Sequence, residues 1–193
     1  MAELGAAASF PAHSPLDGLA LPKGESFALS EAPAAARFIL RGDEGARLAS
    51  GMAFGAEPPL RLGPAGEGAK RAAIWLGPDE WLMIAEGADS AALGETLESA
   101  LDGTAHSLVD VSHRQIGVVA SGDAAARVLN AGCPLDLDVK AFPVGMATRT
   151  LFDKAEIVLW RRAEATFHVE VWRSFAPYLA ASLIEAARGA PGW

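Results

Sequence analysis

The chain has 193 residues and a formal net charge of −8, and it carries a single cysteine. This acidic balance argues against DNA or RNA as a ligand, because phosphate backbones need clustered Lys and Arg. The most apolar segments are far shorter than the ~20 residues of a membrane-spanning helix, and residues 1–12 lack the basic and leucine-rich regions of a secretory signal. As the single cysteine, Cys133 cannot form an internal disulfide or a CxxC metal site, which fits a reducing cytosol. Together these features predict one cytoplasmic protein domain with no nucleic-acid or membrane partner.

Residues 1–35 are predicted to form an N-terminal arm. They contain four prolines among Ala, Gly and Ser, and few bulky side chains. Within the arm, residues 14–19 (SPLDGL) combine two leucines, Leu16 and Leu19, with a turn. Such an apolar segment docks on a surface, either of its own chain or of a partner.

The first half of the remaining chain predicts a hairpin followed by a helix. A strand is expected at 36–41, and loops at 42–70, where seven Gly and three Pro occur, with a short strand near 60–62. Two strands at 72–76 and 81–85 flank the turn Gly-Pro-Asp-Glu and form the hairpin. A helix over 89–101 follows, since Leu93, Leu97 and Leu101 recur on one face and Asp89 or Ser90 can cap it.

The second half repeats this pattern. The predicted elements are strands at 107–112 and 115–120, a short helix at 124–130, strands at 146–152, 156–162 and 166–172, and a closing helix at 174–188 with Ser174 as its N-cap. The strand 166–172 (TFHVEVW) alternates apolar and polar side chains, so we expect His168 to face solvent or an interface.

Both halves therefore contain a hairpin, a short loop and an amphipathic helix. Two such units predict an α+β fold, with antiparallel strands on one side and helices packed on the other. We expect residues 36–190 to form a single domain of two pseudo-repeats, 36–104 and 105–190.

The densest polar cluster is Asp110-Val111-Ser112-His113-Arg114. Asp, Ser and His together suggest a catalytic triad, but a triad needs side chains that converge from separate elements. The structural alternative is a strand end at which Asp110 or Ser112 hydrogen-bonds the turning backbone, and we favour it. A free-standing hydrolase that uses Ser112 and His113 ranks last among the functions considered.

Other kinds of site have less support in the sequence. The histidines and Cys133 match no compact zinc-ligand spacing, so no metal site is predicted. The glycines of residues 63–68 lack the strand-to-helix context of a phosphate loop. Cys133 lies between Gly and Pro at a helix end and is expected to be a small buried residue. Four of the tryptophans lie on or beside strands, and any that face outward would mark a protein interface.

Several long segments resemble the gamma subunit family of heterotetrameric sarcosine oxidase across residues 14–188. These segments are SPLDGL, LGPDEWLMIA, LVDVSHRQIGVVASGDAAARVLNAGCPLDL, FPVGMATRTLFDKAEIVLWR and FHVEVWRSFAPYLAASLIEA. That family is similar to the folate-binding domain of the glycine-cleavage T protein and of aminomethyltransferases. The resemblance implies a duplicated ferredoxin-like α+β architecture of ββα units, with antiparallel sheets packed by helices.

The resemblance also bears on site residues. Its folate-site analogues are Asp110, Ser112, His113 and Glu156. In the transferases an acidic pair begins the strand after the substrate-side loop, whereas the matching positions here are Ala155 and Glu156, so the pair is broken. We therefore expect no catalytic residue and no cofactor in this chain.

By this resemblance, the protein is a non-catalytic structural subunit of a complex that oxidatively demethylates sarcosine to glycine. Its expected partners are the alpha, beta and delta subunits, which would use FAD, FMN, NAD, zinc and tetrahydrofolate. The alternative is a folate-binding or one-carbon-transfer module. The residues expected at a partner interface are Leu16, Leu19, Trp160, Trp172 and His168.

Overall fold

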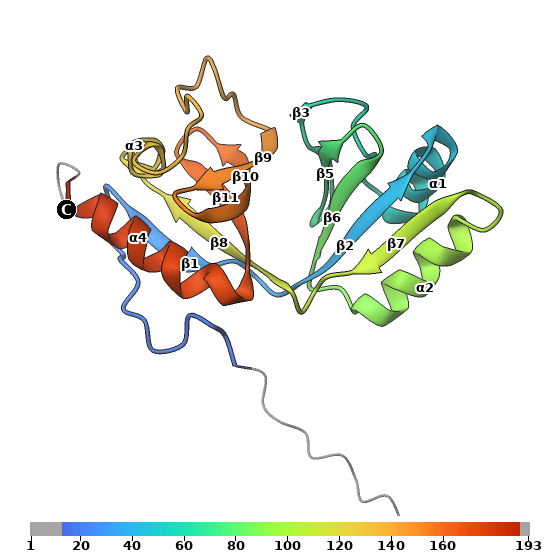
Figure 1. Ribbon diagram of the computed structural model, residues 1–193, viewed down its shortest axis with the longest axis horizontal. Coiled ribbons are helices and arrows are strands. Elements are labelled where there is room, and N and C mark those ends of the chain that lie inside the picture. The colour runs from blue at the N-terminus through green and yellow to red at the C-terminus, as the bar shows by residue number, and fades with distance from the viewer. Residues whose placement is uncertain (1–12, 190–193) are drawn as a thin grey trace, which may run out of the picture.

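The computed structural model describes residues 13–189, which form two antiparallel sheets with helices on their outer faces. In Figure 1 the sheets lie in the middle of the molecule, α3 and α4 cover one of them on the left, and α1 and α2 cover the other on the right. The predicted α+β class, with antiparallel sheets packed by helices, is confirmed.

The first sheet has the strand order β4-β5-β6-β2-β7. Its elements are β2 (Ala35–Gly42), α1 (Glu44–Phe54), β4 (Gly66–Gly68), β5 (Arg71–Gly77), β6 (Glu80–Glu86), α2 (Ser90–Ala100) and β7 (His106–Asp110). Apart from the short β4, they follow one another as β-α-β-β-α-β, the sequence of a ferredoxin-like unit. The predicted hairpin 72–76 and 81–85 is the pair β5 and β6.

The second sheet has the order β1-β8-β11-β10-β9-β3. Its elements are β1 (Ala28–Glu31), β3 (Gly63–Pro64), β8 (Gln115–Ser121), α3 (Ala125–Asn130), β9 (Met146–Phe152), β10 (Ala155–Ala163), β11 (Thr166–Trp172), the 3₁₀ turn η1 (Arg173–Phe175) and α4 (Ala176–Arg188). The alternation of apolar and polar side chains over residues 166–172 correctly predicted both ends of β11.

Each sheet is completed by a strand from the other half of the chain. β1 lies in the predicted arm but pairs with β8 of the second sheet, so residues 28–31 are not a free extension. β7 follows residue 104 but pairs with β2 of the first sheet. The single domain 36–190 with pseudo-repeats 36–104 and 105–190 stays a prediction. Each sheet contains strands from both sides of residue 104.

Two local predictions were wrong. Helix α1 lies in the stretch predicted as loops, where the Asp43 carboxylate accepts the Ala46 N–H at 3.0 Å and Gly55 ends the helix with a φ of 74°. Ser174 does not cap α4, because residues 173–175 form η1 and Phe175 occupies the cap position without a side-chain hydrogen bond.

Three apolar clusters hold these layers together. One lies between the second sheet and α3 and α4, another lies between the first sheet and α1 and α2, and the third lies between the two sheets. The third cluster includes Ile74, Leu82 and Ile84 from the first sheet and Val158 and Trp160 from the second. Both faces of each sheet are therefore covered, and polar side chains on the inner faces must find partners inside the protein.

Candidate functional site

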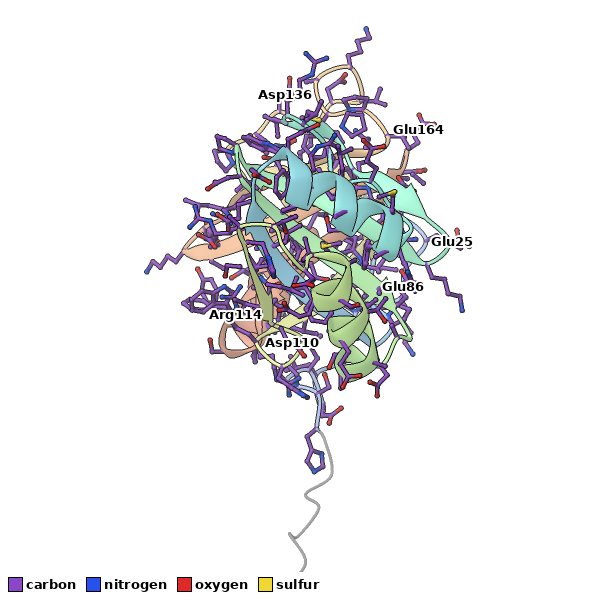
Figure 2. All side chains as sticks on the ribbon, turned by 90° about the vertical axis from the view of Figure 1, so that its right-hand side faces the viewer. Glu25, Glu86, Asp110, Arg114, Asp136 and Glu164 are labelled. Atoms are coloured by element: carbon purple, nitrogen blue, oxygen red, sulfur yellow. The ribbon has the colours of Figure 1, made fainter. Side chains whose placement is uncertain are left out.

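Asp110 and Ser112 hold the segment where the chain crosses from the first sheet to the second. The Asp110 carboxylate accepts the Ser112 backbone N–H at 2.8 Å. The Ser112 hydroxyl in turn accepts the Arg37 backbone N–H at 2.9 Å. These bonds match the turn that we predicted for this cluster, and Figure 2 shows Asp110 in the lower part of the molecule.

The electrostatics of this turn keep Asp110 ionised. Partial burial raises the pKa of its carboxyl, but hydrogen bonds from Ser112 and Ser90 and the charge of His113 outweigh burial and lower the pKa. The carboxylate therefore remains a hydrogen-bond acceptor for the turn near neutral pH.

The other two folate-site analogues, His113 and Glu156, form no hydrogen bond with Asp110 or Ser112 within residues 13–189. His113 is exposed, and the Ser112 hydroxyl contacts the Arg37 backbone and not an imidazole. Glu156 is exposed on β10, opposite Leu151. Within residues 13–189, no hydrogen bond or ion pair connects Glu156 with Asp110, Ser112 or His113.

A buried polar cluster lies between the sheets. Arg37 of β2 donates to both carboxylate oxygens of Glu170 on β11, at 2.6 and 3.0 Å. His168 contacts Glu170 through Nε2 and Oε1 at 2.7 Å. All three side chains are at most 5% exposed. The predicted exposure of His168 was wrong, because the first sheet covers the polar face of β11.

Glu170 stays ionised inside this cluster. Burial raises the pKa of its carboxyl, but the hydrogen bond and charge of His168 and the charge and hydrogen bond of Arg37 lower it below the usual range. We did not identify Arg37 or Glu170 from the sequence. The one available signal was that Glu170 shares the face of His168 on an alternating strand.

Two further ion pairs join the sheets at the two ends of β6. Arg149 of β9 contacts Glu80 at 2.6 Å, and Arg162 of β10 contacts Glu86 at 2.9 Å. In both pairs the side chains are partly exposed. Together with the buried Arg37 pair, they fix the position of one sheet against the other.

The structure separates the five predicted interface residues into two groups. Leu16, Trp160 and His168 are at most 4% exposed, so these side chains are not available to a partner at the surface. Leu16 packs in the core of the second sheet, and Trp160 packs between the sheets. Leu19 and Trp172 are 40% and 43% exposed.

Trp172 forms an exposed pair with Arg114. The guanidinium carbon of Arg114 lies 5.2 Å from the centre of the Trp172 ring. Arg114 forms no ion pair within residues 13–189, and Figure 2 shows it in the lower part of the molecule, as it does Asp110. Trp and Arg are each enriched among the residues that carry most of the binding energy at protein interfaces.

The described part of the chain has neither a metal-ligand cluster nor a helix that could span a membrane. Residues 13–189 contain no group of three or more His, Cys, Asp or Glu side chains that could hold a metal ion. Cys133 is buried in the core of the second sheet, as expected. In the same part of the chain, no helix combines the length and the apolar character needed to cross a bilayer.

Solved structures resemble this fold to different degrees. A chain of the heterotetrameric sarcosine oxidase from Corynebacterium sp. U-96 superposes with a TM-score of 0.84 at 29% identity, covering 92% of this chain and 95% of that chain. The glycine cleavage system aminomethyltransferase T from Bartonella henselae gives a TM-score of 0.63 at 13% identity, covering 86% of this chain and 47% of that chain. The second likeness shows a shared fold alone.

Sequence relatives agree with the first of these structures. Sarcosine oxidase subunit gamma from Corynebacterium sp. strain U-96 is 35% identical over 135 residues, and that from strain P-1 is 37% identical over 136 residues. Each alignment covers 69% of this chain, and 65% and 66% of the respective relative's length. The sequence model of the family described as "Sarcosine oxidase, gamma subunit family" matches residues 42–188. The chain therefore belongs to the sarcosine oxidase gamma subunit family, as its motifs predicted.

Proposed function

We propose that this chain is the gamma subunit of a heterotetrameric sarcosine oxidase and serves there as a non-catalytic structural subunit. The observation that carries the proposal is the likeness, over 92% of the chain, to a chain of such a complex. The alpha, beta and delta subunits would then be its partners. They would hold FAD, FMN, NAD, zinc and tetrahydrofolate, and would convert sarcosine to glycine.

The non-catalytic role is supported by what the polar side chains already do. Asp110 and Ser112 bind the backbone of the crossing segment. Arg37 and His168 both bind Glu170, and all three side chains are buried. A group that activates a substrate must reach it, and these groups are committed to holding the two sheets.

The partner surface is proposed to include Trp172 with Arg114, and Leu19. These are the exposed members of the predicted set together with the guanidinium stacked on one of them. Truncation of Trp172 would remove apolar area from the contact, and charge reversal at Arg114 would place a carboxylate where a cation now lies.

The experiment is co-expression of the four chains, with and without this one. We expect that omission of this chain prevents recovery of the complex. Ser112→Ala and Asp110→Asn should leave the turnover of assembled complex unchanged, and Trp172→Ala and Arg114→Glu should lower its yield. Arg127→Glu is the matched control, since Arg127 is an exposed arginine on α3. Full assembly and full turnover without this chain would refute the structural role.

Calorimetry of the full chain with tetrahydrofolate tests the folate-binding alternative. We expect no heat of binding. Saturable binding that is lost in Glu156→Gln or His113→Ala, with complex assembly intact, would favour the folate module.

A further inference from the structure

A small cavity lies between the two sheets, beside the buried polar cluster. Its volume is about 30 Å³. Lys70, Arg71 and Glu86 line it from the first sheet, and Trp160, Arg162 and His168 line it from the second. This space accommodates a water molecule and is roughly tenfold smaller than the ~300 Å³ of the smallest usual ligand pockets.

Two buried polar atoms belong to side chains that line this cavity. Trp160 Nε1 and His168 Nδ1 are shielded from solvent and have no hydrogen-bonding partner within residues 13–189. The two rings are neighbours, with centroids 5.9 Å apart. Buried polar groups are nearly always paired, with protein or with ordered water, so both atoms point to an occupant of the cavity.

The hydrogen bonds of His168 define what the occupant must offer. Its Nε2 faces the carboxylate of Glu170 at 2.7 Å, and a carboxylate accepts, so Nε2 carries a hydrogen. Nδ1 is then the ring nitrogen left without a partner within residues 13–189. It accepts a hydrogen bond when the ring is neutral and donates one when both ring nitrogens carry hydrogen.

Trp160 imposes a stricter requirement. An indole Nε1–H is a donor only, so the occupant must accept a hydrogen bond from Trp160. Water accepts from Trp160 and can pair with His168 Nδ1 in either form of the ring, because it both donates and accepts. A halide or another simple anion only accepts, so it fits Nδ1 only when the ring is charged, although Lys70 and Arg71 on the cavity wall would attract one.

We propose that this cavity holds one ordered water molecule, which accepts from Trp160 Nε1 and forms a hydrogen bond with His168 Nδ1. The water extends the chain of contacts that runs from Arg37 through Glu170 and His168, and it connects that chain to β10. The Arg162–Glu86 ion pair forms part of the same wall and offers carboxylate oxygens for a water hydrogen. The inner face of the second sheet is then hydrogen-bonded throughout this cluster.

The test is a high-resolution crystal structure of the full chain, with a bromide-soaked crystal as a second arm. We expect a density peak within hydrogen-bond distance of both ring nitrogens, without an anomalous bromide signal. An anomalous peak at that position would identify an anion site and overturn the proposal. A cavity without density would overturn it as well.

Two tryptophan variants sharpen the test. Trp160→Phe removes the donor and should abolish the density peak. Trp75→Phe is the matched control, because Trp75 also has a buried and unpaired Nε1 but does not line this cavity. In solution, the Trp160 indole proton should show a magnetisation-transfer peak to a long-lived water, assigned by its loss in Trp160→Phe and retained in Trp75→Phe. Absence of that peak from the unaltered protein would contradict the crystal assignment.

Discussion

Arg37 and Glu170, which are 133 positions apart in the sequence, meet in a two-pronged ion pair between the sheets. The carboxylate is fully buried and the guanidinium is 5% exposed. Each charge is satisfied by the other and by one further contact, to His168 on one side and to the Ala35 carbonyl on the other. The position of one sheet relative to the other thus depends on a contact between groups that neither sheet could bury alone.

Removal of one partner should destabilise the protein strongly. Glu170→Gln leaves the Arg37 charge buried without a counter-charge, and we expect it to lower the free energy of unfolding by about 3–5 kcal/mol. Urea denaturation measures this change. The control is Asp79→Asn, because Asp79 and Arg41 pair at 3.4 Å with both side chains more than half exposed, a pair worth about 0–1 kcal/mol. Equal losses in the two variants would contradict the interpretation.

A double variant separates charge from packing. Arg37→Met combined with Glu170→Met removes both buried charges, and replacement of a whole buried pair by apolar residues is often neutral. We expect the double variant to be more stable than Glu170→Gln. A loss equal to the sum of the Arg37→Met and Glu170→Met losses would mean that the two side chains have no coupling energy, and would contradict this interpretation.

Acid should weaken the same contact. The pKa of Glu170 is lowered in the folded protein from its ordinary value of 4.5. A carboxyl with a depressed folded pKa contributes stability above its unfolded pKa and loses it as the pH falls through the folded pKa. We therefore expect the urea midpoint to fall as the pH drops below 4.5, and to fall less in Glu170→Gln. Parallel pH curves for the two proteins would rule out this assignment.

His106 should act in the opposite direction. A hydrogen bond from its ring to Glu98, at 3.0 Å, and one to the Thr104 carbonyl raise its pKa above 6.5. A raised folded pKa gives stability that is complete below the unfolded pKa and is lost as the pH rises through the folded pKa. Because Glu98 is half exposed, we expect the His106–Glu98 pair to contribute only about 0–1 kcal/mol to the free energy of unfolding. Nuclear magnetic resonance titration of the His106 ring in the unaltered protein and in Glu98→Gln measures this contribution. An identical titration in both proteins would count against the pair.

Gly117 of β8 is predicted to be intolerant of a side chain. A Cβ there would lie 2.8 Å from the His168 ring and from the Ala32 Cβ, and the ring would have to move away from Glu170. We expect Gly117→Ala to cost about 1–3 kcal/mol in thermal or urea unfolding. Gly94→Ala is the control, since its Cβ would meet Phe38 no closer than 3.4 Å and alanine favours a helix by up to about 1 kcal/mol. A neutral Gly117→Ala would show that His168 is held loosely.

The elements with regular periodicity were predictable from the sequence. The hairpin strands are short apolar runs on either side of a Gly-Pro-Asp-Glu turn, and the helices α2 and α4 have an apolar pattern of period near 3.6. All four elements appear within one or two residues of the expected bounds. Helix α1 was missed because Gly45 and Gly51 dilute its pattern, although Asp43 and Gly55 lie where a cap and a stop belong.

The buried polar cluster could not be predicted in the same way. An alternating strand indicates that one face is polar, but it does not say whether water or a second sheet covers that face. His168 was therefore expected to face solvent or an interface. Its partner Glu170 binds Arg37, which comes from a strand in the other half of the chain. The apolar residue Trp160, in contrast, was correctly expected beside a strand but proved to be buried in the protein's own interior.

β1 and β7 each pair with a sheet built mainly from the other half of the chain, and this affects how the protein folds. The second sheet needs β1, which is synthesised early, and β9 to β11, which are synthesised last. The first sheet needs β7, which the ribosome releases only after its hairpin and both of its helices. Pairings over such sequence distances form slowly and only once most of the chain is present. The two lobes should accordingly gain and lose structure in a single cooperative transition, and a cut at residue 104 would leave neither fragment with a complete sheet.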